Sequence, residues 1–340
     1  KAMRELIRKT TPSLPTPSQS ARKEVTSSPR SAQTHTELLA HWECLNNVEL
    51  QQTTHMDTPA IVTVAAWNIE RCKRVPETAQ VLRESGADIV LATEMDLGMA
   101  RSGQHHTTRD LAEALGMGYA FGVEFVELGT GDPYETGLFK NIPNMHGLHG
   151  NAILSRYEIE NVALLPLDAG GQWFTDTPKN DGQLRIGGRI AMAAQIGGVT
   201  VVAAHYESES DAQGRADQTW RMLDLIAQEY GKGPCIIGGD MNTAAFVGQR
   251  MSGIETLEDP APTEPSFAAF AEAGFDWRSC NAPGVTTRSA PGKPVHYPLK
   301  KLDWLFVRGV TASDPAILPA ICERGDYLSD HELITAKVEL

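Results

Sequence analysis

The chain has 340 residues, of which 41% are hydrophobic and 21% are charged. These values are typical of a soluble globular protein with a substantial core, in one large or two ordinary domains. No apolar run approaches the ~20 residues that a membrane-spanning helix needs. The five cysteines are scattered, and none forms a C-x-x-C pair, which argues against a disulfide framework and a cysteine-held zinc.

The amino terminus, Lys1-Ala2-Met3-Arg4, is charged but lacks the long apolar stretch of a secretory signal. The cysteine pattern favours a reducing compartment, so we expect a cytoplasmic protein. Because the chain does not begin with Met, a removed signal, and with it a secreted or periplasmic location, stays an alternative.

The net charge is −13, from 30 basic and 43 acidic residues. A protein that grips long duplex nucleic acid normally presents a basic face to the phosphates. Beyond the N-terminal tail the sequence has no prominent cluster of Lys and Arg. The charge therefore disfavours nucleic acid as a partner without excluding it.

Residues 1–58 are predicted to form an N-terminal extension. A short basic helix is expected over residues 2–9, followed by a tail rich in Thr, Pro, Ser and Gln up to Gln33. This composition buries little apolar surface, so we interpret the tail as a linker or a surface-hugging extension. A packing helix is expected over residues 36–50, with an apolar side formed by Leu38, Leu39, Trp42 and Leu45.

Residues 59–340 are predicted to form the main globular domain. Apolar, β-branched runs predict strands over residues 61–67, 87–92, 119–127, 190–196, 199–204, 235–237, 302–307 and 333–338. Amphipathic runs predict helices over residues 76–85, 108–115, 213–230 and 265–273. A Gly-rich loop is expected over residues 128–147.

Polar residues recur at the ends of these strands. They are Asn68, Glu94, His149, His205, Asp240, Asn242, Asp303, Asp330 and His331. Two packed sheets flanked by helices would bring such strand ends into one cleft. The set contains acids, amides and histidines, and it resembles neither a Gly-rich phosphate loop with its Lys nor a serine nucleophile elbow.

The central motif is Cys235-Ile236-Ile237-Gly238-Gly239-Asp240-Met241-Asn242-Thr243. Its apolar run predicts a buried strand that ends at two glycines. Asp240 and Asn242 then project to the same side on extended backbone. A carboxylate accepts a proton or orients water, and an amide donates to an anion, which suits attack on a phosphate. The alternative is an Asx-rich turn that closes the strand.

Glu94 ends a buried strand, where a carboxylate is costly unless it is paired or metal-bound. A hard oxygen ligand suits Mg²⁺, and Asn68 could complete the shell; the alternative is a solvated strand end. In Ser329-Asp330-His331, Asp330 could orient the ring, or His331 could donate to a phosphate; the alternative is a turn. His205 taken alone is interpreted as a buried, hydrogen-bonded histidine.

The ordered motifs together resemble one superfamily. They are W-N-I-E, T-E-M-D, G-N-A-I-L-S-R, A-H-Y-E-S, G-G-D-M-N-T, L-D-W-L-F-V and S-D-H-E-L. This order resembles the endonuclease/exonuclease/phosphatase superfamily, which includes DNase I-like nucleases, sphingomyelinases and inositol polyphosphate 5-phosphatases. The resemblance spans residues 60–340 and implies a DNase I-like four-layer α/β sandwich, in which two packed mixed β-sheets are flanked by helices.

The resemblance also implies roles for individual residues. Asn68 and Glu94 match the metal site, which would hold Mg²⁺, with Mn²⁺ as the alternative and one or two ions left open. Asp240 matches the acid that activates water. Further residues would contact the phosphate or support the site, namely His205, Asn242, Asp303 and the closing pair Asp330-His331. Asp330 would aid metal binding or hold His205, and we expect His331 to be protonated because acids lie nearby.

Departures from the pattern bear on the substrate. Abasic-site nucleases usually carry a Tyr where His149 stands, so His149 either contacts phosphate or caps a loop; Asn151 is a candidate substrate contact beside it. The loop over residues 170–188, with Trp173, is expected to border the cleft. Arg185 either reads a second anionic group or is a surface arginine.

We therefore expect a metal-dependent phosphodiesterase or phosphatase that acts on a small or lipid-linked phosphoester. A nuclease is the alternative within the class, and a catalytically silent binding protein is the alternative outside it. The complete set of motif residues argues against silence. The oligomeric state stays open.

Overall fold

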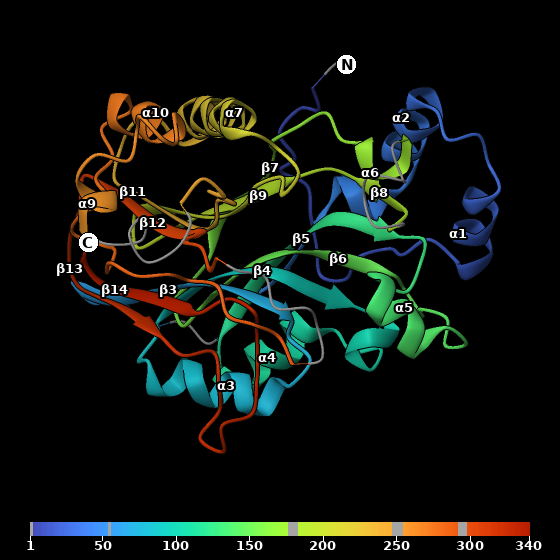
Figure 1. The fold of residues 1–340 in the computed structure, drawn as a ribbon, viewed down its shortest axis with the longest axis horizontal. Helices are drawn as coiled ribbons and strands as arrows, with labels where there is room; N and C mark the ends of the chain where they lie inside the picture. Colours follow the sequence, from blue (N-terminus) through green and yellow to red (C-terminus); the bar gives the residue numbers. More distant parts are fainter. Residues whose placement is uncertain (1–2, 54–55, 176–182, 247–253, 292–297) are drawn as a thin grey trace.

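The computed structural model describes residues 3–53, 56–175, 183–246, 254–291 and 298–340 (Figure 1). Within these ranges, the larger sheet has nine strands. In order these are β1 (Thr10–Thr11), β2 (Val48–Gln51), β5 (Gly118–Glu127), β6 (Leu148–Ser155), β4 (Ile89–Leu97), β3 (Ile61–Arg71), β14 (Leu333–Glu339) and β13 (Thr311–Leu318), with β8 (Arg185–Gly187) paired to β5.

The smaller sheet has five strands in the described part of the chain. In order these are β12 (Asp303–Arg308), β11 (Cys235–Asp240), β10 (Val199–His205), β9 (Ile190–Ile196) and β7 (Glu160–Pro166). Both sheets are mixed, because β3 pairs parallel with β4 and β10 pairs parallel with β11, whereas most other neighbours are antiparallel.

Helices cover the outer face of each sheet, which gives four layers (Figure 1). The larger sheet is covered by α3 (Val75–Glu84) and α4 (Thr107–Leu115), and the smaller one by α7 (Ala212–Tyr230) and α10 (Ser266–Glu272). Other α-helices among the described residues are α1 (Gln19–Thr26), α2 (Ala32–His41), α5 (Pro133–Phe139), α6 (Gln172–Thr175) and α9 (Ile254–Glu258). The four-layer α/β sandwich expected from the motifs is confirmed.

Side-chain alternation on β3 shows how the layers are joined. Val64 and Ala66 face the apolar core between the two sheets, whereas Ala65 and Trp67 face the core beneath α3 and α4. Successive residues of a strand point to opposite faces, so one strand serves both cores. A third apolar core, containing Met222 and Phe267, lies between the smaller sheet and its helices. Strands buried on both faces explain the continuous apolar runs of the sequence.

The N-terminal extension differs from expectation. The helix predicted over residues 2–9 is wrong for the described residues 3–9, because Ile7 exchanges two backbone hydrogen bonds with Leu164 at the edge of β7. The tail contains α1 and the start of α2, which are capped by Ser18 and Ser31. Ser is a good helix cap, so these polar residues start helices where their composition indicated a linker or a surface-hugging extension without helices.

The helix predicted over residues 36–50 is three elements. They are the end of α2, a 3-10 helix (η1, Glu43–Asn46) and strand β2, which pairs with β5. Strand pairing completes the edge of the larger sheet and overrides the local helical pattern. The predicted packing role is nevertheless confirmed, since Leu39, Trp42 and Leu45 are buried in the core with Trp67.

The loop predicted over residues 128–147 contains α5, which begins at an Asp132 cap. Residues 176–182, within the loop expected to border the cleft, lie outside the described residues. Across the described ranges, no helix combines the length and the apolar character needed to cross a membrane.

Candidate active site

Strand register aligns three polar residues at the end of the smaller sheet. Asp240, the last residue of β11, pairs with His205 of β10 on one side and with Asp303 of β12 on the other. The larger sheet contributes Asn68, whose Nδ2 donates a hydrogen bond of 3.1 Å to Oδ2 of Asp240. Four of the strand-end residues predicted to converge therefore lie together across the two sheets.

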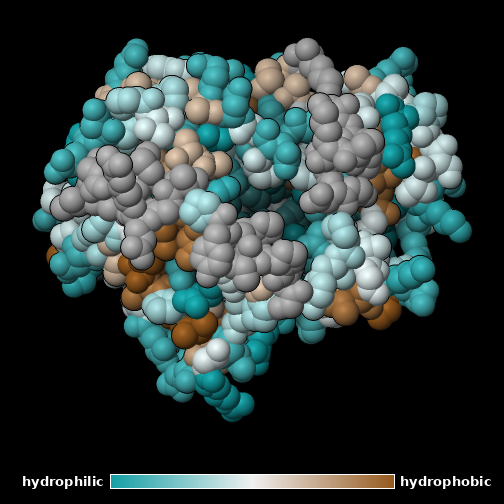
Figure 2. All heavy atoms as spheres, viewed as in Figure 1, coloured by the Kyte–Doolittle hydropathy of each residue, from teal (hydrophilic) through white to brown (hydrophobic). Residues whose placement is uncertain are grey.

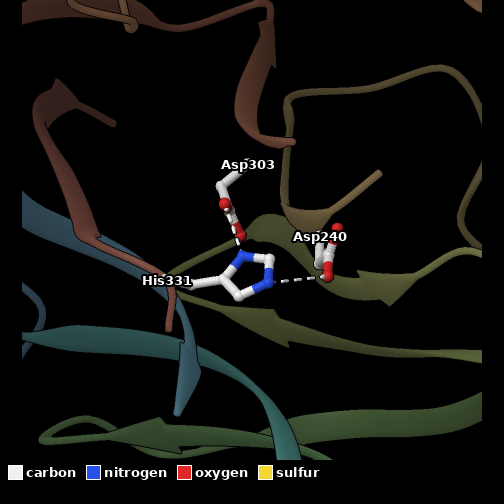
Figure 3. A group of neighbouring side chains, drawn as sticks. All are labelled: Asp240, Asp303 and His331. Carbon is white, nitrogen blue, oxygen red and sulfur yellow. Dashed lines mark hydrogen bonds and ion pairs between the residues drawn. The ribbon is translucent and has the colours of Figure 1, made fainter. Parts of the chain in front are cut away.

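His331 lies between two carboxylates (Figure 3). Its Nδ1 is 2.8 Å from Oδ2 of Asp303, and its Nε2 is 3.6 Å from Oδ2 of Asp240. Trp67 donates to the backbone oxygen of His331 at 2.8 Å, which fixes the segment that carries the ring. Burial alone would lower the pKa of His331, but the charges of Asp303 and Asp240 raise it well above its ordinary value. The two neighbouring acids thus favour the imidazolium form of this ring.

His205 forms a second histidine–acid pair. Its Nδ1 is 3.1 Å from Oε2 of Glu124, and its Nε2 is 3.8 Å from Oδ2 of Asp240. Arg189 donates to the other oxygen of Glu124 at 3.1 Å. Burial would raise the pKa of Glu124, but the charges of His205 and Arg189 lower it below its ordinary value. Asp240 is consequently approached by the Nε2 atoms of two histidines, each held by its own carboxylate.

Glu124 was not among the predicted site residues. Its sequence signal is an acid within the apolar run of β5, flanked by Val123 and Phe125. A fully buried carboxylate requires a charged partner, which the pattern alone does not name. The partner of His205 is thus Glu124, whereas Asp330 was one expected candidate for that role.

The candidate metal residues lie on the parallel strands β3 and β4. Both strands shift register beside them, between Asn68 and Arg71 and between Ala92 and Met95. Glu94 has a φ of +61°, and Arg71 one of +76°. Side chains rarely adopt this conformation, and such strain concentrates at functional sites.

Glu94 is paired with Arg71, a residue that sequence reasoning did not single out. Burial would raise the pKa of Glu94, but the charge of Arg71, and then that of His205, hold it well below its ordinary value. Oδ1 of Asn68 accepts from the backbone of Glu70 at 3.2 Å. An ionised carboxylate and an amide oxygen fit a hard divalent cation, which would compete with Arg71 for Glu94.

A cavity also borders His331. Asp330 is half-buried, and together with His331 and Asp132 it lines a cavity of about 320 Å³ that also contains Arg288 and Lys300. Asp240, Asp303 and His331 additionally offer three ligand atoms within 4.8 Å of one another. A larger cavity of about 620 Å³, lined by Glu49, His106 and Tyr119, contains none of the predicted site residues.

The contacts of Asn242 fit both interpretations of its motif, the Asx turn and the amide that donates to an anion. Its backbone N–H donates to Oδ1 of Asp240 at 2.9 Å, which is the Asx turn considered from the sequence. Its Nδ2 donates to the backbone oxygen of Tyr206 at 2.9 Å, which uses one of its two N–H groups. The side chain is therefore fixed beside Asp240, with one amide hydrogen left for an anion.

The three predicted substrate contacts are all buried. Nδ1 of His149 lies 2.8 Å from Oδ1 of Asp96, and burial lowers the pKa of this histidine. Asn151 donates to Ile190 at 3.1 Å, whereas its Oδ1 has no hydrogen-bond partner among the residues described.

Arg185 is 5% exposed, so its interpretation as a surface arginine is wrong. Its guanidinium lies 4.3 Å from the Trp173 ring and 4.8 Å from the Phe125 ring, and Nε is 3.4 Å from Glu127. Cation–π contact and the nearby acid hold it inside the protein.

Comparison with known proteins identifies the family. The model of the Endonuclease/Exonuclease/phosphatase family matches residues 65–331, which include both histidine–acid pairs. The chain belongs to the Endonuclease/Exonuclease/phosphatase family. Its members are in general phosphoester hydrolases. A curated relative, the uncharacterized protein YbhP of Escherichia coli K12, is 28% identical over 205 residues, which are 59% of this chain and 67% of YbhP.

Solved structures share the fold at low identity. An endonuclease/exonuclease/phosphatase family protein of Beutenbergia cavernae has a TM-score of 0.55 and 19% identity, over 82% of this chain and 72% of that one. An AP endonuclease of Archaeoglobus fulgidus has a TM-score of 0.52 and 17% identity, over 81% and 98%. A mannosyl-6-phosphatase of Bacteroides thetaiotaomicron has a TM-score of 0.50 and 17% identity, over 82% and 100%. The fold is thus common to family proteins named for different substrates.

Proposed function

We propose that this family member is a divalent-metal-dependent phosphoester hydrolase acting on a small or lipid-linked phosphoester. The observation that carries the proposal is the arrangement around Asp240, whose Oδ2 lies 3.8 Å from Nε2 of His205 and 3.6 Å from Nε2 of His331. One buried carboxylate and two histidines with separate acid partners match the requirements of water attack on phosphorus.

Each residue would contribute a distinct step. Asp240 would orient the attacking water and accept its proton. The imidazolium of His331 would donate to a phosphate oxygen, because Asp303 keeps it charged. His205, oriented by Glu124, would donate on the other side of Asp240 and protonate the leaving oxygen. Asn242 would hold the phosphate through its remaining amide hydrogen.

Glu94, Asn68 and Asp330 would hold the cation. Bound there, Mg²⁺ or Mn²⁺ would supply charge that neutralises the anionic oxygens of the ester. The low pKa of Glu94 supports this role, because the carboxylate is ionised at working pH.

The test is hydrolysis of bis-p-nitrophenyl phosphate with Mg²⁺, with Mn²⁺ and with chelator. Turnover should require the cation, and Asp240→Asn and His331→Gln should each reduce kcat by about 10²–10³-fold or more while the Tm changes little. Normal turnover in Asp240→Asn would contradict the proposal. Plasmid nicking is measured in parallel, and a rate above that on the small ester would favour the nuclease alternative despite the charge of −13.

A further inference from the structure

Helix α5 buries its charged residue and exposes its apolar residues. Its acid, Glu135, is 2% exposed, whereas Tyr134 and Leu138 are 48% and 60% exposed. A helix on the surface of a soluble domain normally turns its apolar residues inward and its charges outward. The reversed arrangement places apolar surface in contact with water in the protein alone, which is costly unless that surface has a partner.

Ion pairs hold α5 in this orientation. Oε2 of Glu135 lies 3.1 Å from Nη1 of Arg101, and Oε1 lies 3.4 Å from Nε of Arg71 and 3.6 Å from Nζ of Lys73. Asp132 and Glu135 also form a capping box that fixes the start of the helix. The outward apolar face is therefore set by the structure of the helix and does not result from a loosely attached segment.

The apolar surface extends beyond the helix. Ile142 and Met145, in the segment that follows, are 49% and 61% exposed. We name Tyr134, Leu138, Ile142 and Met145 the α5 patch. Half of the eight exposed large hydrophobic residues in the described part of the chain belong to it. Figure 2 shows hydrophobic side chains gathered over α5 at the lower right of the face in view.

The α5 patch adjoins the candidate active site. Asp132, the cap of α5, lines the 320 Å³ cavity together with His331 and Asp330. Arg288 and Lys300 line the same cavity and would face an anionic group inside it. A surface that covers the α5 patch would thus present its own phosphates beside the catalytic histidine.

The charges around the α5 patch favour one kind of partner. Between residues 133 and 145 the acidic residue is the buried Glu135, and Lys140 is exposed. In a chain of net charge −13, the side chains of this segment thus add no exposed acid to the face they form. Such a face suits a surface of phosphate headgroups over hydrocarbon.

We propose that the α5 patch docks the enzyme on a phospholipid surface and that the substrate is a phosphoester of a lipid. This inference rests on the proposed function and narrows its substrate class. Leu138 and Ile142 enter the headgroup–acyl boundary, and the cavity beside His331 receives a headgroup phosphate. The other exposed hydrophobic residues, such as Ile61 and Trp220, take no part.

Sedimentation with phosphatidylcholine vesicles tests the docking in chelator, where metal-dependent turnover is blocked. The wild-type chain should sediment with the vesicles. The double variant Leu138→Ser, Ile142→Ser should partition about tenfold less strongly or weaker still. The matched control is Ile61→Ser, which removes a side chain exposed by 57% elsewhere and should bind as the wild type does. A wild-type chain that stays in the supernatant, or a double variant that binds normally, would overturn the proposal.

Two further measurements separate the remaining outcomes. If light scattering shows a wild-type dimer and a monomeric double variant, with no vesicle binding, the α5 patch is an interface between copies and the proposal is overturned. With metal present, release of soluble phosphate esters from vesicles should fall in the double variant, whereas its turnover of bis-p-nitrophenyl phosphate should equal that of the wild type. Absence of all hydrolysis, with vesicle binding intact, would contradict the proposed function and leave the docking surface supported.

Discussion

At the scale of single residues, Glu124 shows how a buried acid can act through another side chain. It does not reach Asp240, but it lies 3.1 Å from Nδ1 of His205, which turns Nε2 of that ring toward Asp240. A carboxylate on one imidazole nitrogen fixes the orientation and tautomer of the ring. We therefore interpret Glu124 as a positioning residue for His205.

Glu124→Gln should lower kcat by about 10–100-fold, with KM changed much less, because the amide keeps the shape of the side chain but loses the carboxylate charge that orients the ring of His205. Steady-state kinetics on bis-p-nitrophenyl phosphate would measure the changes in kcat and in KM separately. The matched control is Glu127→Gln, which changes a buried acid of the same strand that contacts Arg101 and Arg185. An effect confined to KM, or an equal loss in both variants, would argue against positioning.

Lys301 is a buried lysine whose charge lowers the stability of the folded protein. It is fully buried, its Nζ donates to the oxygen of Ala282 at 3.1 Å, and it lies 4.6 Å from the Trp304 ring. Burial lowers its pKa from 10.5 to about 8. The unfolded chain therefore binds more protons between these two pH values, and stability should rise with pH across that window.

Lys301→Met should accordingly be more stable than the wild type at pH 7. The pKa shift corresponds to a loss of roughly 3 kcal/mol from the free energy of unfolding of the wild type at pH 7. The substitution removes this loss but also removes a hydrogen bond worth about 1 kcal/mol, so the net gain in stability is about 2 kcal/mol. Urea unfolding at pH 7 and pH 9.5 should show the gain shrinking at the higher pH. The exposed Lys337→Met is the control and should change little; a less stable Lys301→Met at pH 7 would refute the expectation.

At the scale of elements, the sequence predicted the strands better than the segments that attach to them. The runs ending at Trp67 and Ala92 are buried on both faces, so apolar composition identified them. Their continuation through the bulges beside Asn68 and Glu94 was missed, because polar residues there interrupt the pattern but not the pairing. β2 was predicted as helix, since its strand character depends on β5, 67 residues or more away in the chain.

The same distinction applies to the candidate site. Asn68, Asp240 and His331 follow strands or belong to local motifs, and the register brings them together. Glu124 and Arg71 could not be assigned from the sequence, because their roles depend on which buried charge from another strand faces them. Burial of Arg185 between two rings likewise depends on β5 and α6 meeting in space.

Glu49 of β2 anchors the N-terminal extension to the larger sheet. Its carboxylate accepts from the backbone of Leu14 at 2.9 Å and from the hydroxyl of Tyr119 at 2.6 Å, and it lies 2.7 Å from Nε2 of His106. Burial would raise the pKa of Glu49, but the hydrogen bond and charge of His106 bring it below its ordinary value of 4.5. The stabilisation from this ionised group is thus complete above pH 4.5 and is lost as the pH falls through the lower, folded-state pKa.

Glu49→Gln should lower the free energy of unfolding by about 2 kcal/mol at pH 7, through loss of charge-assisted hydrogen bonds. The difference from the wild type should diminish in acid, where Glu49 itself becomes protonated. Chemical unfolding at pH 7 and pH 3.5 would measure both values. A difference that does not depend on pH would show that the charge of Glu49 is not the stabilising feature.

At the scale of the whole molecule, the site exists because two sheets meet at a fixed distance. The hydrogen bond from Asn68 to Asp240 joins the larger sheet to the smaller one. Two residues before Asp240, Gly238 faces the core between the sheets, and a Cβ there would lie 2.7 Å from Leu305, 2.9 Å from Leu91 and 3.0 Å from Ala66. The absence of a side chain at this position therefore sets how closely β11 approaches β3 and β4.

Gly238→Val should disturb stability and catalysis together. Overpacking of a dense core costs about 1–3 kcal/mol, and a displacement of ~1 Å between Asn68 and Asp240 can reduce kcat by about 10²-fold. The control is Gly233→Val, five residues before Gly238 and ahead of the start of β11, where an added Cβ would meet nothing within 4 Å. Thermal unfolding and turnover of bis-p-nitrophenyl phosphate would be measured on both variants. A Gly238→Val variant with a lower Tm but an unchanged kcat would contradict this expectation. That result would mean that the positions of the catalytic residues do not depend on how closely the two sheets pack.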